Sequence, residues 1–195
     1  PKLNGFDWIL QRLFCGLPVS SSEVFLMGSG GLLKEIPSRP TPRSMGTQFS
    51  RSKDHRIYAL VLAAGYDPGL CSEPDGKTNI AKVVDAALSS DSSGVYVVTG
   101  TDEEKIIKVL SNEPVSFAHN PNFDQGMSTS IRRGLSALPV DTDAVMMCLG
   151  NAPTPSTTTI NALISAFNPY QQQSLCVVLR NGRRDNPVLI GRRFF

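Results

Sequence analysis

Apolar residues follow two different periods along the chain from residue 57 onwards. Between short apolar runs, apolar residues recur at helical spacing, which predicts helices over 80–88, 101–110, 127–138 and 160–167. The second of these helices begins with residues 101–104, Thr-Asp-Glu-Glu, which read as a capping box. The apolar runs themselves are typical of buried strands and span 57–62, 95–98, 115–118, 144–149 and 174–179. Strands that alternate with helices predict an α/β fold with a mainly parallel sheet.

The residues before position 57 lack this alternation. Residues 6–15 carry apolar side chains at helical spacing and predict a short amphipathic helix. Residues 39–55 are rich in Pro, Ser and charged residues and have no apolar period, which indicates a linker. The segment ahead of the linker is too short to bury a core of its own. The pattern therefore predicts an appendage at 1–43, a linker at 44–56 and an α/β domain at 57–195.

Composition excludes several classes of function. With 41% hydrophobic and 18% charged residues, the chain is typical of a globular protein, and its net charge of +2 without a basic block argues against nucleic acid as a partner. No apolar run is long enough to span a bilayer, so we expect no membrane association and a cytoplasmic location. The four cysteines form no CxxC pair and are expected to be reduced and buried. The two histidines lie too far apart in the chain to suggest a zinc site.

In a parallel sheet, ligands bind where the loops after the strands converge. The first such loop contains Leu62, Ala63, Ala64 and Gly65. Its small residues would let the phosphates of a nucleotide approach the backbone amides, although close packing alone also explains them. The sequence therefore offers a nucleotide site here and leaves the packing explanation open.

Two further loops carry polar residues. The segment 126–130, Gly-Met-Ser-Thr-Ser, opens a helix and offers amides and hydroxyls for an anion or a ribose, unless Ser128 is an ordinary N-cap. The loop 149–153 follows an apolar strand, where a carboxylate would hold a divalent cation, but it contains the neutral Asn151. Residues 185–187, Asp-Asn-Pro, present a further polar pair toward the same cleft.

Taken in order, these segments resemble the molybdenum cofactor cytidylyltransferase and guanylyltransferase family, with the cytidylyltransferase branch favoured. The matching stretches are 59–65, 80–88, 97–100, 119–121, 126–130, 149–153 and 186–189. The resemblance implies a Rossmann-like three-layer αβα sandwich of the nucleotide-diphospho-sugar transferase type, which is C-terminally incomplete in this chain. Residues 1–43 resemble the tail of a molybdopterin-binding domain that is fused ahead of such a transferase.

The resemblance also implies an activity, ligands and site residues. A molybdopterin phosphate would attack the α-phosphorus of CTP, or less favourably GTP, with Mg²⁺ as cofactor and with a molybdoenzyme or its chaperone as a further partner. Catalytic residues are not assigned. The nucleotide site would consist of Leu62, Ala63, Ala64, Gly65 and Lys77, and the metal position would be Asn151. The residues that would face molybdopterin are Asn120, Gly126, Met127, Ser128, Ser130, Asn186 and Pro187.

The chain departs from the family pattern in two places. The first loop lacks the basic residues that neutralise the triphosphate, and Asn151 stands where the family has a metal-holding Asp. Phosphoryl-transfer chemistry depends on positioning and charge stabilisation, so these departures predict a weakened catalyst. Two other functions stay open: a non-catalytic module that binds the cofactor, and a sugar-phosphate nucleotidyltransferase.

Overall fold

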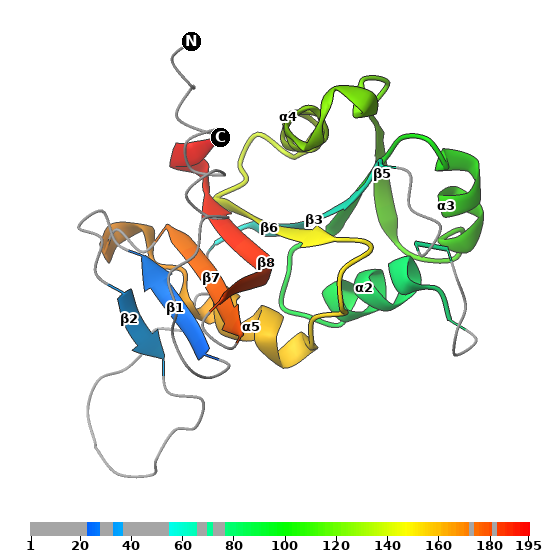
Figure 1. The fold of residues 1–195 in the computed structure, drawn as a ribbon. Coiled ribbons are helices and arrows are strands. Elements are labelled where there is room, and N and C mark those ends of the chain that lie inside the picture. The colour runs from blue at the N-terminus through cyan, green and yellow to red at the C-terminus, as the bar shows by residue number, and fades with distance from the viewer. Residues whose placement is uncertain are drawn as a thin grey trace.

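The chain forms a single mixed sheet that is covered by helices on both faces (Figure 1). The computed structural model describes residues 23–27, 33–36, 55–65, 70–71, 77–171, 174–180 and 183–195. The predicted helix at 6–15 and most of the predicted linker lie outside these residues.

The sheet has eight strands in the order β2-β1-β7-β8-β6-β3-β4-β5. The strands are β1 (Glu23–Met27), β2 (Leu33–Ile36), β3 (Ile57–Ala63), β4 (Val95–Thr99), β5 (Val115–His119), β6 (Ala144–Leu149), β7 (Leu175–Arg180) and β8 (Arg183–Gly191). β6, β3, β4 and β5 are parallel to one another, as the alternation of strands and helices predicts. β8 joins β6 antiparallel, and β7, β1 and β2 continue the sheet in antiparallel pairs.

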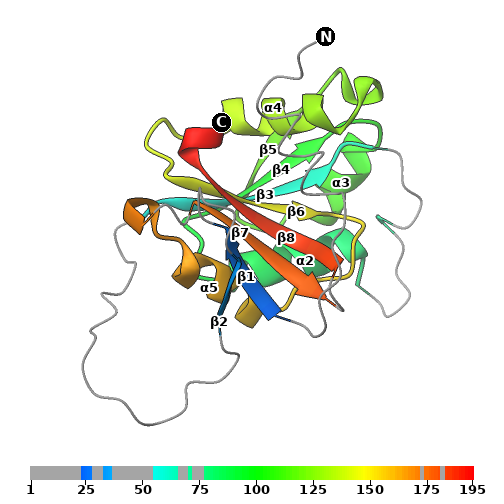
Figure 2. The same ribbon diagram turned by 60° about the vertical axis from the view of Figure 1, so that its left-hand side comes forward.

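The helices divide between the two faces of the sheet and confirm the predicted three layers (Figure 2). The helices are α2 (Asn79–Leu88), α3 (Glu103–Val109), α4 (Met127–Ala137) and α5 (Thr157–Ala166). Side chains of α2, α3 and α5 pack with the larger apolar cluster on one face, and Ile131 of α4 packs with Leu60 and Val98 on the other. The alternation of inward side chains along β3 and β6 supplies both clusters, because successive residues of a strand face opposite sides.

Helix starts are set by local side chains in two cases and differ from the prediction in two others. Thr78 caps α2 by accepting from the amide of Ala81, and Ser156 caps α5 in the same way. The predicted capping box at 101–104 is wrong: Asp102 is the N-cap of α3 and makes no side-chain capping bond. Capping of α4 by Ser128 is also wrong, because the helix begins after Gly126, whose φ is 107°.

The antiparallel half of the sheet includes residues from the predicted appendage. β1 pairs with β7 over five positions, from Glu23 opposite Leu179 to Met27 opposite Leu175. Two strands of segment 1–43 therefore extend the sheet of the α/β region. The predicted boundary at 44–56 falls mainly outside the described residues, and the division into domains stays a prediction.

The described cysteines Cys71, Cys148 and Cys176 are free thiols, as expected; Cys15 lies outside the described residues. Burial raises the pKa of both Cys148 and Cys176 to about 12, so neither forms a thiolate near neutral pH. Cys71 is partly buried, and burial together with the nearby Asp102 raises its pKa. Within the described part of the chain, no helix is long and apolar enough to cross a membrane.

Candidate functional site

The loops after the four parallel strands are joined to one another at the carboxyl edge of the sheet. The Gly150 amide donates to the Leu62 carbonyl at 3.0 Å, which links the loops after β6 and β3. The Thr101 amide donates to the Ala64 carbonyl at 3.2 Å, and the Asn120 amide donates to Thr99 at 2.8 Å. Backbone hydrogen bonds therefore fix the three loops that the sequence identified as carriers of chemistry.

The first loop, at the end of β3, leads from buried residues to Gly65, which is exposed. Ala63 and Ala64 are only 4% and 3% exposed, whereas Gly65 is exposed and a Cβ placed on it would meet no atom of the described residues within 4 Å. The small residues at 63 and 64 are thus explained by packing, and the space beside the loop lies at Gly65. That space is where a ligand could reach the backbone amide.

A neighbouring glycine allows this loop to lie where it does. A Cβ on Gly100 would stand 2.2 Å from the Ala64 carbonyl oxygen, so only glycine lets the loops after β3 and β4 approach so closely. The sequence contained a signal for this role, because Gly100 directly follows a strand. Sequence reasoning did not assign it to the site.

Lys77 does not lie free to replace the missing positive charge of the first loop. Its ammonium nitrogen is 3.0 Å from a carboxylate oxygen of Asp85, in the second turn of α2. This exposed ion pair contributes little to stability, so it does not prevent Lys77 from turning to a ligand. The role predicted for Lys77 in nucleotide binding stays a prediction.

In the second loop, the side chain of Asn120 hydrogen-bonds to other residues of the loop and to the first turn of α4. Its side chain is buried, and its Nδ2 donates to the hydroxyls of Thr129 and Ser130, both at 2.9 Å. Its Oδ1 accepts from the Asn122 amide at 3.0 Å. Asn120 and Ser130, two of the residues predicted to face the acceptor, are thus brought together and bond each other.

We expect Asn120→Ala to lower the free energy of unfolding by about 2–3 kcal/mol, because the buried Ser130 hydroxyl and the Thr129 hydroxyl lose a donor and the Asn122 amide loses its acceptor. Chemical denaturation would measure this. Gln125→Ala in the same loop is the matched control and should change stability by less than about 0.5 kcal/mol, since its bond to Asn122 is long and exposed. Equal stability of both variants would show that Asn120 does not hold the loop.

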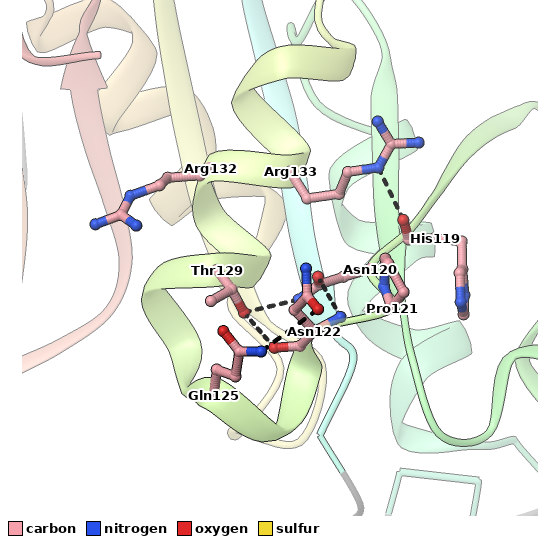
Figure 3. A pocket seen from close by; sticks show the side chains of 8 residues that line it. All are labelled: His119, Asn120, Pro121, Asn122, Gln125, Thr129, Arg132 and Arg133. Carbon is pink, nitrogen blue, oxygen red and sulfur yellow. Dashed lines mark hydrogen bonds between the residues drawn. The ribbon is translucent and has the colours of Figure 1, made fainter.

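A pocket of about 680 Å³ opens between this loop and α4 (Figure 3). Arg133 donates from Nε to the His119 carbonyl at 2.8 Å across the pocket, while Arg132 extends from α4 in a different direction. The remaining predicted acceptor residues of this loop lie at the start of α4: Gly126 and Met127 are exposed and Ser128 is half-buried. The lining residues are His119, Asn120, Pro121, Asn122, Gln125, Thr129, Arg132 and Arg133.

The third loop is held by a residue from β8. The Leu149 amide, at the end of β6, donates to Oδ1 of Asn186 at 3.1 Å. Pro187, the next residue, is buried and has no amide hydrogen to continue the ladder between β6 and β8. Asn186 therefore lies beside the end of β6, and within the described residues its Nδ2 is buried without a hydrogen-bond partner. Whether residues 185–187 face a ligand stays a prediction.

The fit of this edge to a divalent cation is partial. Asn151 is exposed directly after β6, and its amide oxygen is one neutral ligand. The described residues include no group of three or more His, Cys, Asp and Glu side chains that could hold a metal ion. A cation here would depend on the phosphate oxygens of a nucleotide for most of the negative charge that balances its own.

A chain of polar side chains at the ends of β4 and β5 was not predicted. The buried hydroxyl of Thr99 donates to Oε1 of Glu103 at 2.8 Å, and Oε2 of Glu103 lies 3.0 Å from Nδ1 of His119. The sequence pattern predicts Glu103 as part of a capping box. Its carboxylate instead pairs with the imidazole of His119, at the end of β5.

Comparisons with known proteins agree with this fold. A nucleotidyl transferase from Methanothermobacter is 27% identical with a TM-score of 0.51, over 56% of this chain and 56% of that chain. The 4-diphosphocytidyl-2C-methyl-D-erythritol synthase of Anaerococcus prevotii is 18% identical with a TM-score of 0.53, over 71% of each chain. A CMP:2-keto-3-deoxy-manno-octonic acid synthetase is 10% identical with a TM-score of 0.56, over 71% of this chain and 75% of that one. These likenesses confirm the predicted fold type.

This chain spans little more than half the length of the Methanothermobacter protein. No curated protein matches it in sequence. The family described as the MobA-like NTP transferase domain matches residues 69–195, which is more than half of the chain. The chain therefore belongs to the family of MobA-like NTP transferase domains.

Proposed function

We propose that the protein transfers CMP from CTP to the phosphate of molybdopterin. A phosphate oxygen of molybdopterin attacks the α-phosphorus of CTP, the bond from that phosphorus to the oxygen bridging to the β-phosphate breaks, and pyrophosphate leaves. The observation that carries this proposal is the exposed Gly65 at the carboxyl edge, which no other described residue covers and which follows a loop fixed by backbone hydrogen bonds. Family membership supports the reaction class, and the ordered resemblance to the cytidylyltransferase branch supports the acceptor.

The described residues would act mainly by positioning. The amide of Gly65 would donate to a phosphate oxygen, since glycine has no side chain of its own to cover it and the residue is exposed. Mg²⁺, when bound with the nucleotide, would neutralise charge on the phosphates, and Asn151 would offer it an amide oxygen. Asn186, bonded to Leu149, would keep the third loop in place while it and the segment 126–130 face the acceptor. A molybdoenzyme or its chaperone would receive the product.

We expect Asn151→Asp to raise Mg²⁺-dependent release of pyrophosphate by about tenfold, because a carboxylate offsets the cost of desolvating the cation and an amide does not. The gain should stay partial, since the first loop still lacks bases that neutralise the triphosphate. Pyrophosphate release with CTP and molybdopterin, measured across a Mg²⁺ titration, tests this. Asn112→Asp, which adds the same charge at an exposed position in the turn before β5, is the control and should not shift the Mg²⁺ dependence.

The same assay separates the proposal from its two alternatives. Tight binding of molybdopterin with no pyrophosphate release in either variant would favour a non-catalytic module, for which the amide at Asn151 is the supporting observation. Turnover with sugar phosphates in place of molybdopterin would favour a sugar-phosphate nucleotidyltransferase. Identical Mg²⁺ titrations for the parent and Asn151→Asp would remove Asn151 from the metal position.

A further inference from the structure

Helix α2 begins beside the two loops that would hold the nucleotide and the cation. A Cβ placed on Gly150, in the loop after β6, would stand 2.9 Å from Cδ1 of Ile80, in the first turn of α2. The same Cβ would stand 3.2 Å from the carbonyl oxygen of Leu62, near the end of β3. The start of α2 is therefore packed against the carboxyl edge of the sheet, and Lys77 directly precedes the N-cap of this helix.

Lys77 is the first basic residue that follows β3 along the chain. Residues 57–76 contain no Lys or Arg. Arg56, the base that precedes β3, lies at the opposite edge of the sheet, where the strand begins. A triphosphate at Gly65 carries several negative charges, and a nearby cation stabilises them. By its place in the fold, the ammonium group of Lys77 is available for that role.

In the structure, the side chain of Lys77 is folded along α2 and does not point to the carboxyl edge. Its Nζ donates to Oδ2 of Asp85 at 3.0 Å. Asp85 lies six residues after the first residue of α2, which is about 9 Å along the helix axis. α2 joins the parallel strands β3 and β4, so it runs back from the carboxyl edge. Asp85 therefore holds the ammonium group away from Gly65.

The ion pair is weak enough for a nucleotide to break it. The side chains of Lys77 and Asp85 are 44% and 57% exposed, and solvent screens a pair of this kind. A triphosphate carries more negative charge than one carboxylate and attracts the ammonium group more strongly at the same distance. The carboxylate and a phosphate at the edge lie at different heights along α2, so one ammonium group cannot bind both.

We propose that Asp85 competes with the triphosphate of the nucleotide for Lys77, which makes the ion pair an autoinhibitory contact. The inference rests on the proposed function, because it takes Lys77 as a ligand of the triphosphate of CTP. In the free protein the ammonium group is paired with Asp85, and in the complex it turns to the phosphates. Asp85 thus lowers nucleotide affinity without touching the nucleotide.

Calorimetric titration of the full chain with CTP and with inorganic triphosphate, at fixed Mg²⁺, tests the competition. Asp85→Asn keeps the size of the side chain and should tighten binding of both ligands by about two- to fivefold, the range that exposed ion pairs contribute. Asp91→Asn removes the same charge at an exposed position beyond the other end of α2 and should change affinity by less than about 1.3-fold. Equal affinities of the parent and Asp85→Asn, or no measurable binding of either ligand, would overturn the proposal.

Lys77→Met separates competition for Lys77 from a general effect of charge. This variant should bind both ligands about threefold more weakly than the parent or worse, because it lacks the ammonium group. Adding Asp85→Asn to Lys77→Met should then leave the affinity unchanged within about 1.3-fold. A gain of the same size in both backgrounds would show that Asp85 acts only by repelling the anion, and the proposal would fail. Thermal unfolding checks that each variant folds.

The outcome also separates the competition from the proposed function. Tighter triphosphate binding in Asp85→Asn that disappears in the Lys77→Met background, in a protein that never releases pyrophosphate from CTP, would refute the reaction and leave the competition standing. Pyrophosphate release in a protein whose CTP affinity is the same with and without the Asp85 carboxylate would refute the competition alone.

Discussion

Gly100→Ala is expected to lower the free energy of unfolding by about 3 kcal/mol or more, because the added methyl would stand 2.2 Å from a backbone oxygen that cannot turn aside. The Ala64 carbonyl also accepts a hydrogen bond from the Thr101 amide, so the added methyl would strain the hydrogen bond that joins the loops after β3 and β4. In a chain of this size the loss corresponds to a fall in melting temperature of roughly 10 °C. Thermal unfolding followed by circular dichroism would measure it.

Gly65→Ala is the matched control for this substitution. The same methyl group there meets no atom within 4 Å among the residues that the structure describes, and stability should change by less than about 0.5 kcal/mol. If Gly100→Ala had the same melting temperature as Gly65→Ala and the parent, the close approach of the two loops would not be a feature of the folded protein.

Gly65→Val is expected to weaken CTP binding by about tenfold or more, while leaving the fold intact, because the branched side chain covers the amide that the proposed nucleotide would reach. The φ of Gly65 is not in the left-handed region, so valine can adopt the local backbone conformation. Calorimetric titration with CTP and with GTP, together with a melting curve, would separate lost binding from lost folding.

The control for the binding experiment is a valine at another exposed position near the edge of the sheet. Thr101→Val leaves the backbone bond from residue 101 to Ala64 in place and should leave CTP affinity within about twofold of the parent. Unchanged affinity for both nucleotides in Gly65→Val would place the nucleotide elsewhere.

The parallel half of the sheet and its helices could be predicted because each element carries its own period. β3 and β6 are continuous apolar runs, since both faces of these strands are covered by helices. α2 and α5 show stripes of buried residues on one side only. These are local properties, and the order of strands and helices follows from them.

The antiparallel half could not be predicted in the same way. The apolar run at 174–179 predicts β7, but β8 was not predicted as a strand. The strand period is also equal in parallel and antiparallel pairs, so it does not give the direction of a strand. The pairing of β1 with β7 joins residues that are more than a hundred positions apart. No local pattern in either segment encodes that contact.

The sequence by itself determined the α/β class, the strands and helices between residues 57 and 179, and the loops at which polar and small residues collect. Only the tertiary structure decided what these residues do there. Asn120 hydrogen-bonds within its own loop and to α4, Asn186 accepts a hydrogen bond from the Leu149 amide, and Glu103 pairs with His119 and is not part of a capping box. The reason is physical. Secondary structure follows from neighbours along the chain, whereas the partner of a polar side chain is set by residues that only the folded sheet brings within hydrogen-bond distance.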